Sequence, residues 1–172
     1  KTVSGKTYYY ENDIKAMGWR EIGGKYYYFS VKDGHLCKKV IIKTDSTAYY
    51  VDKKGVRVKN KVVTKKDKTY YFGADGKALT GVRKLNKKYY YFSPESFYML
   101  KNYKYVTPAG TIYYFDSNGV RVKNKFVTIN ENGKKNTYYF GSNGKAYKGW
   151  HKIKGKKYYF YRGTGAKAGV RA

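Results

Sequence analysis

Pairs of tyrosines followed by a third, mostly apolar residue recur along the chain. Eight such triplets lie 19 to 25 residues apart, at positions 8–10, 27–29, 49–51, 70–72, 90–92, 113–115, 138–140 and 158–160. Neighbouring side chains of a strand point to opposite faces, so Tyr70 and Phe72 should share one face and Tyr71 should take the other. Asp-Gly or Asn-Gly pairs, such as residues 75–76 and 118–119, follow several triplets and favour tight turns. The pattern therefore predicts short β-hairpins.

A longer repeat overlies the hairpins, because Gly55–Lys61 recurs letter for letter at Gly119–Lys125. A two-stranded hairpin cannot bury a face alone in water, so each unit must stack on its neighbours. We therefore expect an all-β fold, a β-solenoid of stacked short β-hairpins. Residues 1–172 should form a single repeat array of about eight hairpin units. The rings that packing does not use should form aromatic shelves in the grooves between consecutive hairpins.

Composition changes this picture in two ways. The chain has 24 Tyr against 8 Phe and 2 Trp, so its core must consist largely of phenol rings. Its net charge is +27, from 38 basic and 11 acidic residues. This charge fits a solvated surface that protects strand edges, and it also fits attraction to a polyanion such as teichoic acid. Both interpretations stay open.

The chain boundaries and apolar runs bear on location. Residue 1 is Lys rather than Met, and residues 169–171 repeat the letters of residues 81–83, so we expect a piece of a longer protein. No apolar run is long enough to span a bilayer, so no membrane insertion is expected. Cys37 is the single cysteine, which excludes an internal disulfide.

Residues 137–150 contain paired aromatics, an Asn-Gly turn and a Gly-Trp pair. In this combination the segment resembles the cell-wall-binding (choline-binding) repeats. It is also similar to the glucan-binding repeats of glucansucrases and to clostridial toxin repeats. The resemblance covers essentially the whole chain. It implies a hairpin solenoid in secreted, cell-surface proteins of Gram-positive bacteria, with choline on teichoic acid or α-glucan as the usual ligands.

A choline cage needs aromatic faces on several sides of a quaternary ammonium. The resemblance implies a Gly-Trp indole, an aromatic residue before the tyrosine pair and a ring from the next hairpin. Trp19, Tyr26 and Tyr50 match this pattern once. Elsewhere the pattern decays, since Trp150 is accompanied by Lys157 and Val82 stands where Trp is expected. At most one complete cage is therefore expected, on a surface whose surplus lysines repel cations.

Glycan binding needs only rings that lie against the C–H faces of sugars, with hydrogen-bonding groups nearby. The residues predicted to bind carbohydrate are Trp19, Tyr26, Tyr28, Tyr50, Tyr91, Tyr147, Trp150 and Tyr159. Most of the tyrosines must be structural, and the two tryptophans are the stronger candidates. The leading hypothesis is a non-catalytic carbohydrate-binding module that anchors a secreted protein to α-glucan or to cell-wall polysaccharide.

No catalytic, metal-ligating or cofactor-binding constellation stands out. Carboxylates such as Asp33, Asp52 and Asp116 follow the triplets, where turn chemistry explains them. His35 and His151 lack a plausible partner for catalysis. The alternatives are electrostatic attachment to anionic teichoic acid, choline binding at one site, and a structural spacer or protein-binding adhesin. Nucleic acid is not an expected partner, because the basic residues are spread over all repeats. Polyanion binding should weaken steeply with salt, whereas ring-on-sugar binding should not.

Overall fold

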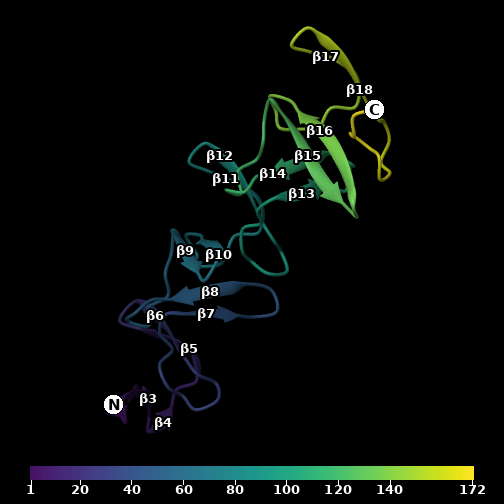
Figure 1. Cartoon of the computed structure of the whole chain (residues 1–172). Coiled ribbons are helices and arrows are strands. Elements are labelled where there is room, and N and C mark those ends of the chain that lie inside the picture. Colours follow the sequence, from purple (N-terminus) through teal and green to yellow (C-terminus); the bar gives the residue numbers. More distant parts are fainter. The chain divides into compact units, whose positions relative to one another are not determined.

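The computed structural model describes residues 1–172 and contains 18 strands and no helix (Figure 1). Every strand pairs with one neighbour in sequence, which gives nine two-stranded sheets. No segment is a helix with the length and apolarity that a membrane span requires. The hairpins are β1 (Thr2–Val3) with β2 (Lys6–Thr7), β3 (Tyr10–Glu11) with β4 (Ile14–Lys15), β5 (Gly18–Ile22) with β6 (Lys25–Phe29), β7 (Val40–Lys43) with β8 (Ala48–Val51), β9 (Lys61–Lys65) with β10 (Lys68–Phe72), β11 (Gly81–Leu85) with β12 (Lys88–Phe92), β13 (Tyr103–Val106) with β14 (Ile112–Phe115), β15 (Lys125–Glu131) with β16 (Lys134–Phe140), and β17 (Gly149–Ile153) with β18 (Lys156–Phe160).

Chain contacts divide the protein into two compact units. The first unit comprises residues 1–81 and 92–98, and the second comprises residues 82–91 and 99–172. Seven of the eight triplets end the second strand of a hairpin, as the sequence pattern predicts. The first triplet differs, because Tyr8 and Tyr9 lie between two short hairpins and only Tyr10 enters a strand. The single array of about eight units over residues 1–172 stays a prediction.

Side-chain oxygens of aspartate or serine close several of the turns that follow the triplets. The Asp52 Oδ1 atom accepts hydrogen bonds from the backbone N–H groups of Lys54 at 2.8 Å and Val56 at 3.0 Å. Asp116 binds Asn118 and Val120 in the same way, at 2.8 and 2.9 Å. These bonds confirm that turn chemistry explains the two carboxylates. They also return the chain to the edge of its own hairpin.

The third residue of the triplet forms the core. It is at most 2% exposed in all seven hairpins that carry a triplet in one strand, at Phe29, Val51, Phe72, Phe92, Phe115, Phe140 and Phe160. The middle residue lies on the opposite face of the strand. Alternation thus gives each of these seven hairpins a buried third residue, aromatic in all but Val51, and a middle ring on the other face that can contact the next hairpin.

Several consecutive triplets are joined by the same ring contact, between the middle ring of one triplet and the third ring of the next. In the first unit Tyr50 stacks on Phe72, with ring centroids 6.2 Å apart, and Tyr9 stacks on Phe29 at 6.0 Å. In the second unit Tyr114 stacks on Phe140 at 6.1 Å. Stacking of hairpins is therefore encoded in the triplet itself.

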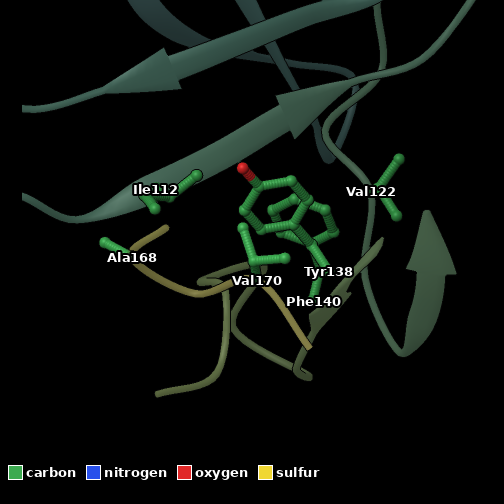
Figure 2. Close-up of a cluster of buried hydrophobic side chains, with 6 residues drawn as sticks. All are labelled: Ile112, Val122, Tyr138, Phe140, Ala168 and Val170. Carbon is green, nitrogen blue, oxygen red and sulfur yellow. The ribbon is translucent and has the colours of Figure 1, made fainter. Parts of the chain in front are cut away.

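Each unit also holds one cluster of buried apolar side chains. In the second unit the cluster consists of Ile112, Val122, Tyr138, Phe140, Ala168 and Val170 (Figure 2). In the first unit it consists of Ala48, Tyr70, Phe72, Ala78 and Phe97. Both clusters mix aromatic rings with small side chains, which matches the tyrosine-rich composition. The rings fill the volume that leucine and isoleucine fill in most cores.

Candidate functional site

The first candidate site is a group of three aromatic rings around Trp19. Trp19 on β5 pairs across the hairpin with Tyr28 on β6, and their ring centroids are 5.1 Å apart. Tyr26 lies two residues before Tyr28 and therefore faces the same side of the strand. Tyr49 on β8, in the next hairpin, places its ring 5.0 Å from the indole. The structure thus brings rings from two hairpins together, as the cage pattern requires.

The ring that the next hairpin contributes to this group is that of Tyr49 rather than that of Tyr50. The sequence pattern places Tyr50 with Trp19 and Tyr26. In the structure Tyr50 points to the opposite face of β8 and stacks on Phe72. The difference is one residue, and one residue changes the face of a strand. The sequence did not indicate which face of β8, and therefore which of the two tyrosines, would lie against Trp19.

The group around Trp19 is already occupied by a side chain of the protein. The guanidinium carbon of Arg57 lies 4.0 Å from the ring centroid of Tyr26, 5.5 Å from that of Tyr49 and 5.6 Å from that of Trp19. All three distances fall within the range of cation–π attraction. We call this arrangement, with Trp19, Tyr26 and Tyr49 as walls, the arginine-filled cage. Sequence reasoning missed Arg57, although it lies in the segment that is repeated letter for letter.

The same arrangement occurs in the second unit with fewer rings. The Arg121 guanidinium carbon lies 3.9 Å from the ring centroid of Tyr89 and 5.2 Å from that of Tyr113. Arg171 lies 5.9 Å from the ring centroid of Phe126. These three arginines occupy equivalent places in the repeat. Arg57 lies over three aromatic rings, Arg121 over two and Arg171 over one.

The second candidate site is the open face around Trp150 on β17. Its indole is 68% exposed and lies 5.2 Å from the ring of Tyr159, its cross-strand partner on β18. A depression of about 370 Å³ is lined by Trp150, His151, Lys152 and Lys157. Lys152 and Lys157 are directly paired across the hairpin. An apolar plate thus lies beside two ammonium groups.

The remaining predicted binding residues are packed against other rings. Tyr91 is 8% exposed and stacks on Tyr105, with 4.5 Å between centroids, and on Tyr103 at 5.3 Å. Tyr147 stacks on His151 at 3.8 Å. The eight predicted residues therefore fall into separate places: Trp19, Tyr26 and Tyr28 together, Trp150 and Tyr159 together, and Tyr50, Tyr91 and Tyr147 each in its own stack. Their role in binding stays a prediction.

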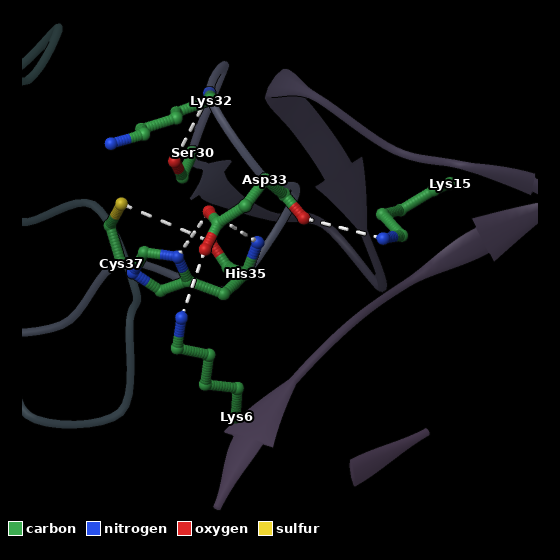
Figure 3. A network of polar contacts seen from close by, with 7 residues as sticks. All are labelled: Lys6, Lys15, Ser30, Lys32, Asp33, His35 and Cys37. Carbon is green, nitrogen blue, oxygen red and sulfur yellow. Dashed lines mark hydrogen bonds and ion pairs between the residues drawn. The ribbon is translucent and has the colours of Figure 1, made fainter. Parts of the chain in front are cut away.

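A polar network around Asp33 lies in the first unit (Figure 3), and it gives His35 an aspartate partner that the sequence did not predict. Asp33 Oδ1 lies 2.5 Å from His35 Nδ1, and Asp33 Oδ2 accepts a hydrogen bond from Lys6 Nζ at 3.0 Å. These bonds, with that to His35 the largest, hold the pKa of the Asp33 carboxyl well below its usual range. Burial raises the pKa of the Cys37 thiol, which disfavours its nucleophilic thiolate form. No group of three or more His, Cys, Asp and Glu side chains is placed to hold a metal ion.

Comparison with protein families supports the repeat interpretation. Residues 79–126 match the family described as the choline-binding repeat. Residues 17–32, 63–78, 124–146 and 148–166 match the family described as the cell wall binding repeat. Together these matches cover more than half of the chain. The chain belongs to the cell-wall-binding (choline-binding) repeat family. This confirms the resemblance drawn from the paired aromatics and the Gly-Trp motif.

Two curated relatives of this member of the repeat family are glucosyltransferases. Glucosyltransferase-S of Streptococcus mutans is 36% identical over 157 residues, which are 89% of this chain and 10% of that protein. Glucosyltransferase-I of Streptococcus downei is 34% identical over 156 residues, which are 88% of this chain and 10% of that protein. The chain thus spans about a tenth of the length of each relative.

Solved structures of similar fold include two proteins of Streptococcus pneumoniae. Choline binding protein F is 25% identical, with a TM-score of 0.63 over 96% of this chain and 55% of that chain. The modular autolysin LytC, solved with a synthetic peptidoglycan ligand, is 21% identical, with a TM-score of 0.68 over 96% of this chain and 37% of that chain. These neighbours confirm the predicted fold class, an all-β solenoid of stacked hairpins.

Proposed function

We propose that this chain is a non-catalytic carbohydrate-binding module that attaches a larger secreted protein to α-glucan at the bacterial surface. Membership of the repeat family indicates that the repeats bind carbohydrate or cell wall. The choice of α-glucan rests on the two glucosyltransferases that share 36% and 34% of the aligned residues with this chain. A cell-wall polysaccharide is the alternative carbohydrate ligand for such a module.

The observation that carries the proposal is the open indole of Trp150. The 68% exposed Trp150 adjoins Tyr159, whose ring in turn contacts the exposed Tyr161, and adjoining aromatic side chains left exposed indicate a binding face better than packing does. Tyr159 supports the indole from the side, and this contact limits its motion. A pyranose ring has an apolar C–H face that can lie on such a plate.

The polar groups of the depression suit a neutral, hydroxyl-rich ligand. Lys152 and Lys157 line it and supply ammonium donors, and both are exposed. His151 is fixed by its stack on Tyr147 and by a 3.1 Å contact between Nε2 and the carbonyl oxygen of Lys148. Because one shallow site binds weakly, retention on a polymer would depend on several repeats or chains acting together.

Electrostatic attachment to anionic teichoic acid is the second candidate. It is favoured by the net charge of +27 and by the two lysines that face each other across the β17–β18 hairpin. In this case the indole would be incidental and the contacts would be ionic. Each phosphate contact would release counterions, so binding would weaken steeply as salt is added.

The test measures retention on dextran by affinity electrophoresis at low and high salt. We expect Trp150→Ala to lower the affinity about tenfold, a loss of about 1.4 kcal/mol, with little effect of salt. The matched control is Val62→Ala, because Val62 is 54% exposed and occupies the equivalent position opposite the middle tyrosine of its own hairpin. Retention on immobilised teichoic acid that survives Trp150→Ala and is abolished by salt, together with no retention on the uncharged dextran, would instead support the polyanion alternative.

A further inference from the structure

Sugar binding at Trp150 does not explain why the guanidinium of Arg57 lies among three aromatic rings. Its guanidinium carbon lies within 5.6 Å of three aromatic ring centroids, contributed by β5, β6 and β8. Electron-rich faces arranged around one point form a box for a cation. In this box the cation is part of the chain.

We propose that the Arg57 guanidinium is the built-in occupant of the cage formed by Trp19, Tyr26 and Tyr49, and that it determines specificity by excluding quaternary ammonium ligands such as choline. The site is thus a latent choline-type cage that becomes available when Arg57 is removed. This inference does not depend on glucan binding at Trp150, which lies in the other unit.

The backbone places Arg57 in the cage. Its N–H donates a 2.8 Å hydrogen bond to the carbonyl oxygen of Tyr26, one of the cage walls. Gly76 of the following turn lies against the side chain, and a Cβ atom on Gly76 would come within 3.1 Å of Arg57 Nε. Nε is buried and has no hydrogen-bond partner. The side chain is therefore held by its rings and by surrounding backbone rather than by an ion pair.

A tethered cation has an advantage over a free one. The occupant and its cage belong to one chain, so the local concentration of guanidinium at the rings corresponds to an intramolecular effective concentration. Guanidinium is also permanently charged, weakly hydrated and planar, so it stacks on ring faces at a small desolvation cost. A choline molecule would have to displace it.

The repeat supports this role, because the residue at the position of Arg57 varies with the residue that accepts its backbone hydrogen bond. Where the acceptor is a tyrosine, at Tyr26 and Tyr89, the donors are Arg57 and Arg121. Where the acceptor is aliphatic, the donor is alanine: Ala78 binds Ala48 and Ala146 binds Ile112. Leu36 and Arg171 occupy the equivalent position and depart from this pattern, since they bond to Thr7 and Thr137, yet Arg171 still lies over the ring of Phe126.

The test compares choline chloride with sodium chloride at equal concentration. Trp150→Phe serves as the background, so that Trp19 is the single tryptophan and reports on the cage. We expect choline to leave the Trp19 fluorescence and the Tm of this background unchanged. Adding Arg57→Ala should produce a saturable fluorescence change with a Kd on the order of 1 mM and a rise in Tm.

Two further variants serve as controls. Arg57→Lys keeps a tethered cation and should stay insensitive to choline. Arg121→Ala opens a site with only two rings, because Val82 stands where an indole would be, and it should leave Trp19 fluorescence unchanged. Choline binding at Trp19 while Arg57 is present, or a folded Arg57→Ala variant that ignores choline, would overturn the proposal.

A measurement on the unmodified chain decides the question even if Arg57→Ala does not fold. Ring currents should shift the Hε resonances of Arg57 and Arg121 upfield, and burial should slow their exchange with water, relative to the other arginines. Hε resonances at ordinary positions with fast exchange would show that the cages do not hold the arginines and would overturn the proposal.

Discussion

The ring of Tyr50 stacks on the ring of Phe72 in the next hairpin, with 6.2 Å between centroids and 24° between planes. The same relationship joins Tyr114 to Phe140, at 6.1 Å and 28°. In each pair a half-buried middle residue covers a fully buried third residue. Neither hairpin of a pair could bury its ring alone, so the contact couples the stability of neighbouring repeats.

This coupling predicts a large cost for removing Phe72. Its side chain is fully buried and stacks on Tyr50 and Tyr70, so Phe72→Ala should lower the free energy of unfolding by about 3–5 kcal/mol. Urea denaturation followed by circular dichroism measures the loss. Val62→Ala, at an exposed position of the same hairpin, should change stability by less than about 0.5 kcal/mol. Equal effects of the two substitutions would contradict the stacking model.

Gly76 gives a second prediction, which separates backbone strain from crowding. Gly76 and Gly81 both have positive φ, at +77° and +72°, so alanine strains the backbone at either position by about 1 kcal/mol. A Cβ atom at Gly76 would also lie 3.1 Å from Arg57 Nε and from the carbonyl oxygen of Val58, whereas at Gly81 it would meet open space. Gly76→Ala should therefore destabilise the protein more than Gly81→Ala does, as measured by thermal unfolding. Equal losses would mean that Arg57 is not held against this turn.

The sequence alone predicts the hairpins, because the tyrosine triplets and Asx-Gly turns act locally. It also predicts that the first and third rings of a triplet share one face and that the middle ring takes the other, because alternation in a strand is fixed. The position of Tyr50 shows what the sequence could not predict, because Tyr50 stacks on Phe72 and Tyr49 takes its expected place beside Trp19. Whether Tyr49 or Tyr50 meets Trp19 depends on the register between two hairpins, and no local rule fixes that register.

Arg57 shows a second limit of sequence reasoning. A basic residue after a turn is usually interpreted as a solvated surface charge, and nothing local distinguishes Arg57 from the other basic residues among the 38 in the chain. Only the spatial arrangement distinguishes Arg57, since its guanidinium lies over rings that come from three strands. Its presence in both copies of the repeated segment was the one sequence signal that pointed to it.

Glu131 predicts a specific dependence of stability on pH. Its carboxylate forms an ion pair with Lys104 and accepts hydrogen bonds from Tyr138 Oη at 2.6 Å and from Asn136 Nδ2 at 2.8 Å. Burial works against ionisation, but the bonds from Lys104, Tyr138 and Asn136 outweigh it and lower the pKa of Glu131. A lowered folded-state pKa contributes stability above the unfolded-state pKa of about 4.3, and this contribution is lost as pH falls through the folded-state value.

Glu131→Gln should therefore reduce stability at neutral pH and flatten the loss of stability between neutral pH and acid. Thermal unfolding at a series of pH values measures both effects. Glu95→Gln is the matched control, because Glu95 is exposed and forms no ion pair in the structure. A Glu131→Gln profile parallel to that of the unmodified chain would show that this carboxylate does not contribute to the acid response.

The two tryptophans provide the last prediction, because identical substitutions should act on different properties. Trp19 is half-buried and contacts Tyr28, Tyr49 and Arg57, so Trp19→Ala should cost about 3 kcal/mol of stability. Trp150 is 68% exposed, so Trp150→Ala should leave the urea midpoint nearly unchanged and weaken retention on dextran. Trp150→Phe should restore part of that retention, since a flat ring remains. If Trp150→Ala destabilised the fold as much as Trp19→Ala does, the open indole would be a packing element and sugar binding at this face would lose its support.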